Sequence, residues 1–234
     1  MVTRAEGLGP PFSSQYADHK GGMRMLRILI ADDHAIVREG LKQVLSEEFH
    51  QATISETSTA RGTLNLVKTQ KWDILILDIH FPDRNGVEIL KEVKAMQPDL
   101  PVVVLSLSPE DQYGIRVLKA GGAAYLNKES APEELISSVK KVLEGGRYVS
   151  ASLAEKLAAS IAPPRTVPLY QTLSDRELEV LEHIGAGRTV SDIAEALSLS
   201  VKTVSTYRTR LLEKLRLRTT AELIRYAIEH RLSK

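Results

Sequence analysis

Short apolar runs alternate with longer amphipathic segments through much of the chain, and this alternation limits the folds that the sequence can adopt. The runs cover residues 26–31, 73–79, 102–107 and 123–126, with a weaker candidate at 52–56. The segments between them carry apolar residues every three or four positions, which is the spacing of a helix that buries one face. Strands buried on both faces consist of continuous apolar runs. The pattern therefore predicts an α/β fold, a doubly wound five-stranded parallel sheet with helices on both faces.

Helix signals mark the end of this region. Ser130, Pro132 and Glu133 have the spacing of a capped helix start, and Gly145 with Gly146 predicts the end of that helix. A short helical stretch then leads into a Pro-rich segment, which is typical of a semi-rigid connector. After this connector the strand pattern disappears and only helical patterning remains.

The length of 234 residues fits two modest domains, although length alone leaves one large barrel open. We expect a flexible N-terminal extension at 1–22 (or an incorrectly assigned start), a first domain at 23–147, a linker with a short helix at 148–168, and an all-helical domain at 169–234. The extension lacks the continuous apolar core of a signal peptide. No apolar run reaches the roughly 18 residues of a membrane helix. The absence of cysteine fits a reducing compartment, so we expect a cytoplasmic protein.

Polar side chains follow the predicted strands at the points where the strands end. Asp32 and Asp33 follow the first run, Asp78 closes the third, Ser106 ends the fourth, and Lys128 follows the fifth. Because the carboxyl ends of parallel strands share one edge of the sheet, these side chains can converge there. Three carboxylates repel each other unless a cation neutralises them, and oxygen ligands of this kind suit Mg²⁺. Each Asp taken alone is also explained as a helix cap or turn residue.

The motifs that contain these residues resemble the receiver domain of two-component response regulators. The resemblance covers residues 26–145 and rests on Ile30-Ala-Asp-Asp33, Leu77-Asp-Ile-His-Phe-Pro-Asp-Arg-Asn-Gly86, Leu105-Ser106 and Tyr125-Leu-Asn-Lys128. It implies a flavodoxin-like fold whose aspartate, matched here by Asp78, is phosphorylated by a partner histidine kinase or phosphotransfer protein.

The same resemblance implies a role for each matched position. Asp33, Asp78 and the main-chain carbonyl of His80 would hold Mg²⁺, with Asp32 contributing through water. Lys128 and Ser106 would each bind a phosphoryl oxygen. Ser106 and Tyr125 would form the switch that responds to phosphorylation, although Tyr125 is equally explained as a half-buried strand aromatic.

An enzyme is the rival interpretation of this acidic cluster. A Mg²⁺-dependent hydrolase could use Asp78 as nucleophile and release phosphate catalytically. Such an enzyme would want a second acidic residue two positions after the nucleophile, where this chain has His80. We therefore expect a phosphorylation switch and no enzyme, with phosphate turnover as the discriminating observation.

The C-terminal region has the pattern of a helix-turn-helix. Ser174 with Glu177, and Thr189 with Asp192, predict two capped helix starts. The connection 198–200 then leads into a helix over 201–215, and two helices joined by so short a turn are typical of DNA-binding units.

The helix that begins at residue 201 has an apolar face and a polar face. Val204, Tyr207, Leu211 and Leu215 share the apolar face. The residues with the character needed to contact DNA bases and phosphates are Lys202, Thr203, Ser205, Thr206, Arg208, Thr209 and Arg210. A polar helix face is usually only solvated. Between residues 201 and 218, however, six basic residues oppose one acidic residue, and this local charge of +5 fits binding to a phosphate backbone.

Residues 169–232 resemble the LuxR-type DNA-binding domain. The motifs that carry the resemblance are Leu173-Ser-Asp-Arg-Glu-Leu-Glu-Val-Leu181, Gly187, Ile193-Ala194, Leu197 to Ser200, Thr203-Val204 and Lys214-Leu215. A receiver followed by this domain is the arrangement of the NarL/FixJ class, and residues 204–215 resemble BvgA-like and EvgA-like members most. Most of the class has Lys at the position of Ser205 and His at the position of Tyr207, which leaves the operator sequence open.

The resemblance implies a transcription factor that binds promoter DNA as a homodimer after phosphorylation, with RNA polymerase as a further partner and no membrane association. The last helix, with Leu223, Ile224, Ala227 and Ile228, resembles the dimerisation helix of the family, although core packing explains it as well. A protein-interaction adaptor without DNA binding is the remaining alternative.

Overall fold

Five short strands form one parallel sheet in the computed structural model, which describes residues 25–82, 84–129, 132–161 and 168–232. The strands are β1 (Arg27–Ala31), β2 (Thr53–Thr57), β3 (Ile74–Asp78), β4 (Val102–Ser106) and β5 (Ala124–Asn127), in the order β2-β1-β3-β4-β5. The predicted doubly wound sheet is confirmed, including the weak candidate at β2. Most of the apolar runs extend one residue beyond the strands that they predicted. Residues 1–22 and the expected cap Ser130 lie outside the described residues.

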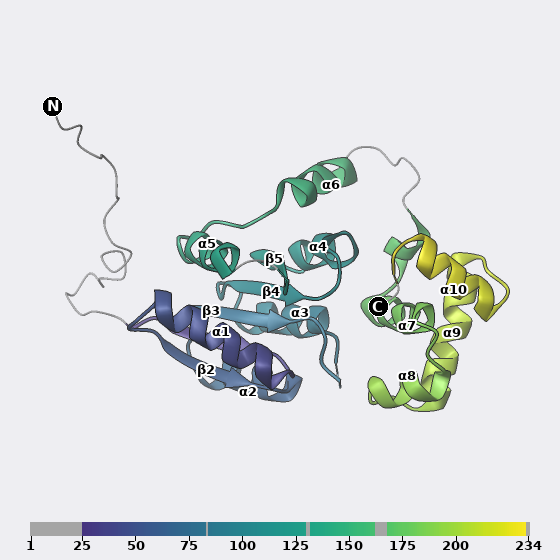
Figure 1. Cartoon of the computed structure of the whole chain (residues 1–234), viewed down its shortest axis with the longest axis horizontal. Helices are drawn as coiled ribbons and strands as arrows, with labels where there is room; N and C mark the ends of the chain where they lie inside the picture. Colours follow the sequence, from purple (N-terminus) through teal and green to yellow (C-terminus); the bar gives the residue numbers. More distant parts are fainter. Residues whose placement is uncertain (1–24, 83, 130–131, 162–167, 233–234) are drawn as a thin grey trace.

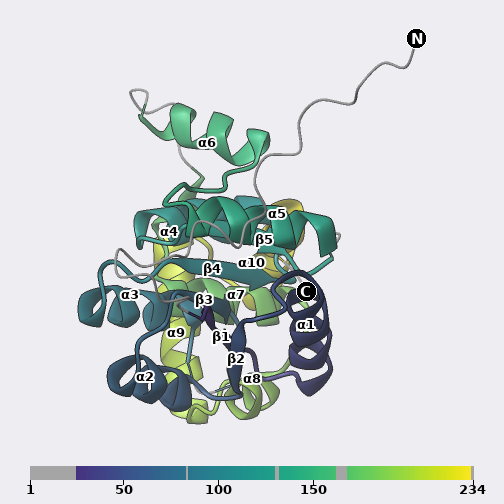
Figure 2. The ribbon, with the colours of Figure 1, turned by 90° about the vertical axis from the view of Figure 1, so that its left-hand side faces the viewer.

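Helices cover both faces of this sheet because successive strand side chains point to opposite sides. Ile28 and Ile30 of β1 pack with α1 (Ala35–Glu48) and α5 (Pro132–Leu143), whereas Leu29 packs on the opposite side. That opposite face is covered by α2 (Ala60–Thr69), α3 (Gly86–Met96) and α4 (Glu110–Lys119). Figure 2 shows α1 on one side of the strands and α2 with α3 on the other. Two helical layers therefore cover the faces of the sheet. The edge formed by the carboxyl ends of the strands is left for a functional site.

Helix α6 (Ala151–Ile161) packs across α4. Leu153 is fully buried there, and its two methyl groups lie 2.9 and 3.0 Å from the position that a Cβ at Gly114 would take, which is too close for a side chain at that position. Ser150 links the two helices, because its hydroxyl donates to the carboxylate of Glu110 in α4 and accepts from the Leu153 amide in α6. The short helix predicted before the Pro-rich segment is confirmed.

The second domain is entirely helical in its described residues. It contains the 3₁₀ helix η2 (Leu169–Thr172), then α7 (Asp175–Gly185), α8 (Val190–Ala196), α9 (Val201–Leu215) and α10 (Thr220–Glu229) (Figure 1). Both predicted capping boxes are present, at the starts of α7 and α8. Ser200 caps α9 by accepting from the Thr203 amide, and Arg216 ends α9 in the left-handed conformation with φ of 58°.

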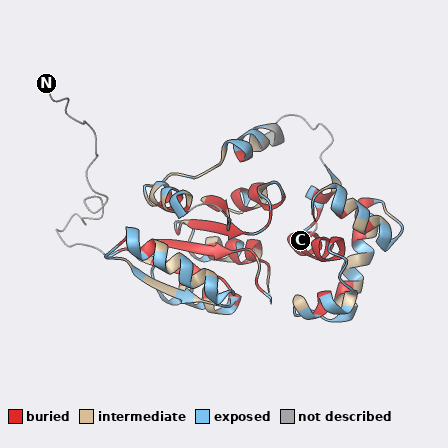
Figure 3. Cartoon of the chain, in the orientation of Figure 1, coloured by how far each residue is buried: buried red, intermediate tan, exposed pale blue. Residues whose placement is uncertain are grey.

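Helix α7 lies between the sheet domain and the other C-terminal helices (Figure 1). All 11 of its residues are buried, as its uniform colour in Figure 3 shows. One hydrophobic cluster continues from the α2, α3 and α4 side of the sheet into the second domain. The two domains are thus packed together. No helix in the described part of the chain has both the length and the apolar composition needed to cross a bilayer.

Candidate functional site

The carboxyl ends of the strands bring the predicted acidic residues together. Asp78 is the last residue of β3, and Asp32 directly follows its neighbour β1. Lys128, just after β5, places its Nζ 2.6 Å from Asp32 Oδ2 and 2.8 Å from Asp78 Oδ2. Asp32 and Asp78 are buried, whereas Asp33 is half-buried at the rim. One ammonium group therefore bridges two buried carboxylates that come from different strands.

The electrostatics of this cluster follow from burial and from that bridge. Burial raises the pKa of Asp78, and Lys128 only partly offsets this effect. Burial by itself would lower the pKa of Lys128, but the charges and hydrogen bonds of Asp78 and Asp32 outweigh it, so the pKa of Lys128 is raised. Lys128 is thus held in its charged form beside the carboxylates.

The oxygen atoms of the cluster fit a divalent cation. Side-chain ligand atoms of Asp32, Asp33, His34 and Asp78 all lie within 4.8 Å of one another. Asp78 Oδ1 is buried and has no hydrogen-bond partner among the described residues. An unpartnered buried carboxylate oxygen is costly unless a cation or a reacting group completes it. Carboxylate ligands of this kind suit a hard divalent ion.

Sequence reasoning missed His34 as a member of this group. Its Nδ1 lies 2.7 Å from Asp33 Oδ1 and 3.3 Å from Asp32 Oδ1. Its position directly after two strand-end carboxylates was the available signal. His80, by contrast, turns its ring toward the end of β4, where its Nε2 lies 3.0 Å from Ser108 Oγ.

Ser106 ends β4, and Tyr125 is the second residue of the neighbouring strand β5. The Ser106 hydroxyl is fully buried and accepts a hydrogen bond of 3.0 Å from the Ser108 amide. The Tyr125 hydroxyl donates to the Ser108 carbonyl at 2.7 Å, and its ring is buried. Both residues expected in the switch therefore contact the same β4–α4 loop.

The α9 helix presents the predicted polar face. Val204, Leu211 and Leu215 are buried, and Tyr207 is half-buried against the core. The outward residues Lys202, Thr206, Thr209 and Arg210 are exposed, and Thr203, Ser205 and Arg208 are half-buried. A shallow surface hollow is lined by Ser200, Lys202, Thr203, Thr206, Tyr207 and Arg210. Of the predicted DNA-contacting residues, the structure therefore brings four together at one surface hollow, namely Lys202, Thr203, Thr206 and Arg210.

Three local contacts modify this face. The hydroxyls of Thr206 and Thr209 donate to the carbonyls of Lys202 and Ser205 in their own helix. Lys214 places its Nζ 2.7 Å from Glu177 Oε2 of α7, so its charge is paired within the domain. The basic patch that the sequence predicts is consequently weaker at Lys214 than the residue count implies.

The proposed dimerisation residues of α10 divide into two groups. Leu223 and Ala227 are fully buried in the domain core, which is the simpler of the two explanations left open by the sequence. Ile224 is half-buried, and Ile228 is 57% exposed. Only the outer part of the helix is therefore free for a partner.

Comparisons with known proteins agree with both halves of this description. Residues 28–140 match the response regulator receiver domain family, and residues 171–227 match the family of bacterial regulatory proteins, luxR family. The response regulator UvrY of Escherichia coli K12 is 32% identical over 209 residues, which cover 89% of this chain and 96% of UvrY. The response regulator GacA of Pseudomonas aeruginosa is 32% identical over 207 residues, which cover 88% of this chain and 97% of GacA.

A solved structure shares the two-domain architecture. RcsB of Salmonella enterica serovar Typhimurium, bound to promoter P1flhDC in the presence of the phosphomimetic BeF3⁻, superposes with a TM-score of 0.62 and 26% identity. The match covers 87% of this chain and 98% of that chain. Similarity to BvgA-like and EvgA-like members stays a prediction.

Proposed function

Because the chain belongs to the NarL/FixJ class of two-component response regulators, we propose that Asp78 is the residue that accepts its phosphoryl group. The protein is a phosphorylation-dependent DNA-binding response regulator. The observation that carries the assignment to Asp78 is its unpartnered Oδ1, beside an Oδ2 that Lys128 holds at 2.8 Å.

The reaction is a phosphoryl transfer from a phosphohistidine of a sensor kinase or phosphotransfer protein. The Asp78 carboxylate attacks phosphorus, a P–O bond forms, and the P–N bond to the donor imidazole breaks. The electron pair of that bond leaves with the imidazole, which takes up a proton. Lys128 stabilises the charge on the phosphoryl oxygens, so positioning and charge neutralisation do most of the catalytic work.

Asp33, Asp78 and the main-chain carbonyl of His80 would hold Mg²⁺, with Asp32 acting through water. When bound, the ion neutralises negative charge on the carboxylates and the incoming phosphoryl group. The donor set is consistent with this, since Asp32, Asp33 and Asp78 present clustered carboxylate oxygens. His34 lies beside Asp33 and keeps that carboxylate oriented.

The switch consists of Ser106 and Tyr125. The Ser106 hydroxyl moves toward a phosphoryl oxygen and gives up its contacts in the β4–α4 loop. Tyr125 is bonded to the same loop through Ser108, so it responds to that movement.

DNA is bound through α9 by the residues Lys202, Thr203, Ser205, Thr206, Arg208, Thr209 and Arg210. A homodimer reads two half-sites, and the exposed Ile228 of α10 contributes to its contact. RNA polymerase is a further partner. Phosphate stays on the protein as a signal and is not turned over as by an enzyme.

The domain bounds that fit this function are a receiver at 23–147, a linker at 148–168 and a DNA-binding domain at 169–234. Residues 1–22 are an N-terminal extension. The protein works in the cytoplasm, where kinase and DNA are both present.

The test of the acceptor is phosphorylation of Asp78→Asn with Mg²⁺ and acetyl phosphate, followed by intact-protein mass spectrometry. We expect one added phosphoryl group on the wild type and none on the variant. Asp99→Asn, which changes an exposed aspartate of the same domain, is the matched control and should be labelled normally. Undiminished labelling of Asp78→Asn would refute the assignment.

A further inference from the structure

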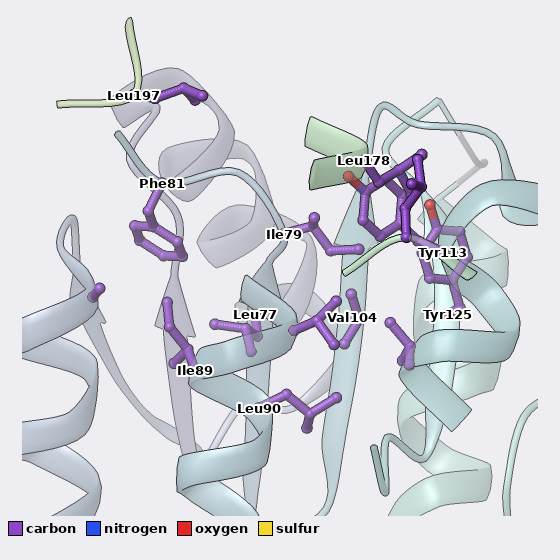
Figure 4. Close-up of a cluster of buried hydrophobic side chains, with 14 of the residues drawn as sticks. Leu77, Ile79, Phe81, Ile89, Leu90, Val104, Tyr113, Tyr125, Leu178 and Leu197 are labelled. Atoms are coloured by element: carbon purple, nitrogen blue, oxygen red, sulfur yellow. The ribbon is translucent and has the colours of Figure 1, made fainter. Parts of the chain in front are cut away.

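The two segments that carry the carboxylates of the pocket are held in place in different ways. Leu77 and Ile79, on either side of Asp78 in the chain, are fully buried in one apolar cluster (Figure 4). Close packing of these neighbours fixes the position of Asp78 at the end of β3. Asp33, in contrast, is only half-buried, and the three residues 34–36 that follow it are exposed. The β1–α1 loop, residues 32–34, therefore needs a support other than apolar packing.

The first turn of α1 does not supply this support. The helix begins after His34, whose side chain makes no capping hydrogen bond to the described residues. Inside the loop, the His34 amide donates to Asp32 Oδ1 at 2.8 Å. This bond bends the chain into a turn but does not connect it to the sheet. Local hydrogen bonds alone therefore leave the loop free to move relative to Asp78.

Arg38, in the second turn of α1, ties the loop to the sheet. Its Nη1 donates to the main-chain carbonyl of Asp32 at 2.8 Å, and its Nε lies 3.5 Å from Glu56 Oε2 of β2. The Arg38 side chain is only 16% exposed, so these charge-assisted contacts are partly shielded from water. The Asp32 amide also donates to the Thr57 carbonyl at 3.2 Å. Asp32 is thus held at its amide by the end of β2 and at its carbonyl by Arg38.

A bond to the Asp32 carbonyl orients both aspartates of the loop. This carbonyl belongs to the planar peptide group that joins Asp32 to Asp33. Fixing the plane restricts the directions in which the two side chains leave the backbone. Groups that orient metal ligands in this way commonly change the metal affinity by roughly 10–100-fold when they are removed.

We infer that Arg38 is a positioning residue for the divalent cation of the pocket and acts through the peptide group between Asp32 and Asp33. The inference rests on the proposed function, which places Mg²⁺ at these carboxylates. The charge of Arg38 by itself repels a cation, so a purely electrostatic role predicts tighter metal binding when Arg38 is replaced by a neutral residue. A positioning role predicts weaker binding. Because the two effects have opposite signs, a binding measurement separates them.

The experiment measures Mn²⁺ binding to the full chain from the loss of the electron paramagnetic resonance signal of free Mn²⁺, with Mg²⁺ as competitor. Arg38→Met keeps the aliphatic stem and removes the guanidinium. We expect its Kd for Mn²⁺ to rise about tenfold or more. Lys42→Met is the matched control, because Lys42 also pairs with Glu56, at 3.8 Å, but lies one turn further along α1. This control should keep the wild-type Kd.

Phosphorylation by acetyl phosphate at increasing Mg²⁺ concentration provides a second measurement. The Mg²⁺ concentration that gives half the maximal rate should rise in Arg38→Met by the same factor as the Kd. The rate at saturating Mg²⁺ should match that of the wild type, because Arg38 acts on the ion and not on the phosphoryl group. Arg38→Lys keeps the charge and one donor but loses the planar fork, so its Kd should rise only about threefold.

The outcomes distinguish the inference from the proposed function. A wild type that binds no Mn²⁺ displaceable by Mg²⁺ contradicts the proposed metal site. A wild type that binds Mn²⁺, together with an Arg38→Met variant that binds it equally well or more tightly, contradicts the inference alone. A lower free energy of unfolding in Arg38→Met with unchanged Mn²⁺ affinity would indicate a purely structural role and would overturn it too. Should Arg38→Met unfold by circular dichroism, Arg38→Lys decides, and a wild-type Kd in that variant contradicts the inference.

Discussion

The pocket formed by Asp32, Asp78 and Lys128 and the polar face of α9 are two functional surfaces that differ in how they are built. The pocket assembles groups from three strand ends, buries them, and holds two carboxylates against one ammonium before any ligand arrives. The α9 face comes from one helix, is exposed, and turns the hydroxyls of Thr206 and Thr209 back onto its own backbone. Chemistry on a phosphoryl group requires fixed geometry, whereas contacts with DNA are completed only on binding. Substitutions in the pocket should therefore lower the free energy of unfolding. Substitutions on the α9 face should weaken only DNA binding.

The largest effect is expected for Lys128→Ala. It leaves Asp32 and Asp78 buried without their cation, so the free energy of unfolding should fall by about 3 kcal/mol, as measured by urea denaturation without Mg²⁺. Lys42→Ala removes a partner from an exposed ion pair with Glu56 and should cost less than about 1 kcal/mol. Equal losses in the two variants would contradict the contrast between buried and exposed charge.

Arg210→Ala should leave the unfolding free energy unchanged within roughly 0.5 kcal/mol and weaken DNA binding instead. Because Arg210 is expected to contact phosphate, affinity should drop for all sequences, and the slope of log affinity against log salt should fall by about one unit. Fluorescence anisotropy with genomic fragments at several salt concentrations measures both quantities. Arg225→Ala, at an exposed position of α10, is the matched control and should keep the wild-type slope.

Thr206→Ala should change which sequences are bound more than how tightly DNA is bound in general. Loss of one hydroxyl contact to a base edge is worth on the order of 1 kcal/mol of discrimination. Selection from a randomised DNA pool would reveal the altered preference. Thr220→Ala, at the exposed start of α10, is the control and should select the same sequences as the wild type. If Thr206→Ala also selects the wild-type sequences, Thr206 does not read bases.

The smallest effect is expected for Lys214→Ala, which tests whether this residue belongs to the DNA face or to the domain scaffold. Burial raises the pKa of Glu177, but the bonds from Lys214 and Ser174 outweigh it, so the pKa is lowered from its ordinary value of 4.5. The Lys214–Glu177 pair therefore stabilises the folded state fully at pH values above 4.5. This stabilisation is lost as the pH falls through the lower pKa that Glu177 has in the folded state. The variant should lose under about 1 kcal/mol at pH 7 and match the wild type in acid. A drop in salt slope as large as that of Arg210→Ala would place Lys214 on the DNA face instead.

The sequence predicted those parts of the molecule that depend on local or repetitive rules. Apolar runs placed the strands, the capping boxes placed the starts of α7 and α8, and the rule that parallel strands share an edge brought Asp32, Asp78 and Lys128 together. These rules hold because each involves neighbours in the chain or a fixed sheet geometry.

The contact between the domains could not be predicted in this way. Arg116 of α4 and Asp175 of α7 form an ion pair between the domains although they are 59 residues apart, and neither has a sequence context that differs from an ordinary solvated helix residue. The same holds for Glu179, whose burial depends on two domains meeting. His34 differs from these residues, because its place in the same turn as Asp32 and Asp33 is a local signal from which its contact with Asp33 could have been predicted.

We propose that phosphorylation of Asp78 controls DNA binding by α9. The most direct measurement is in vitro selection of genomic fragments by the full chain, with Mg²⁺, in the presence and absence of acetyl phosphate, for the wild type and Asp78→Asn. Acetyl phosphate should enrich a defined set of fragments with the wild type and should leave the fragments selected by Asp78→Asn unchanged. Equal enrichment with both proteins under phosphorylating conditions would contradict it.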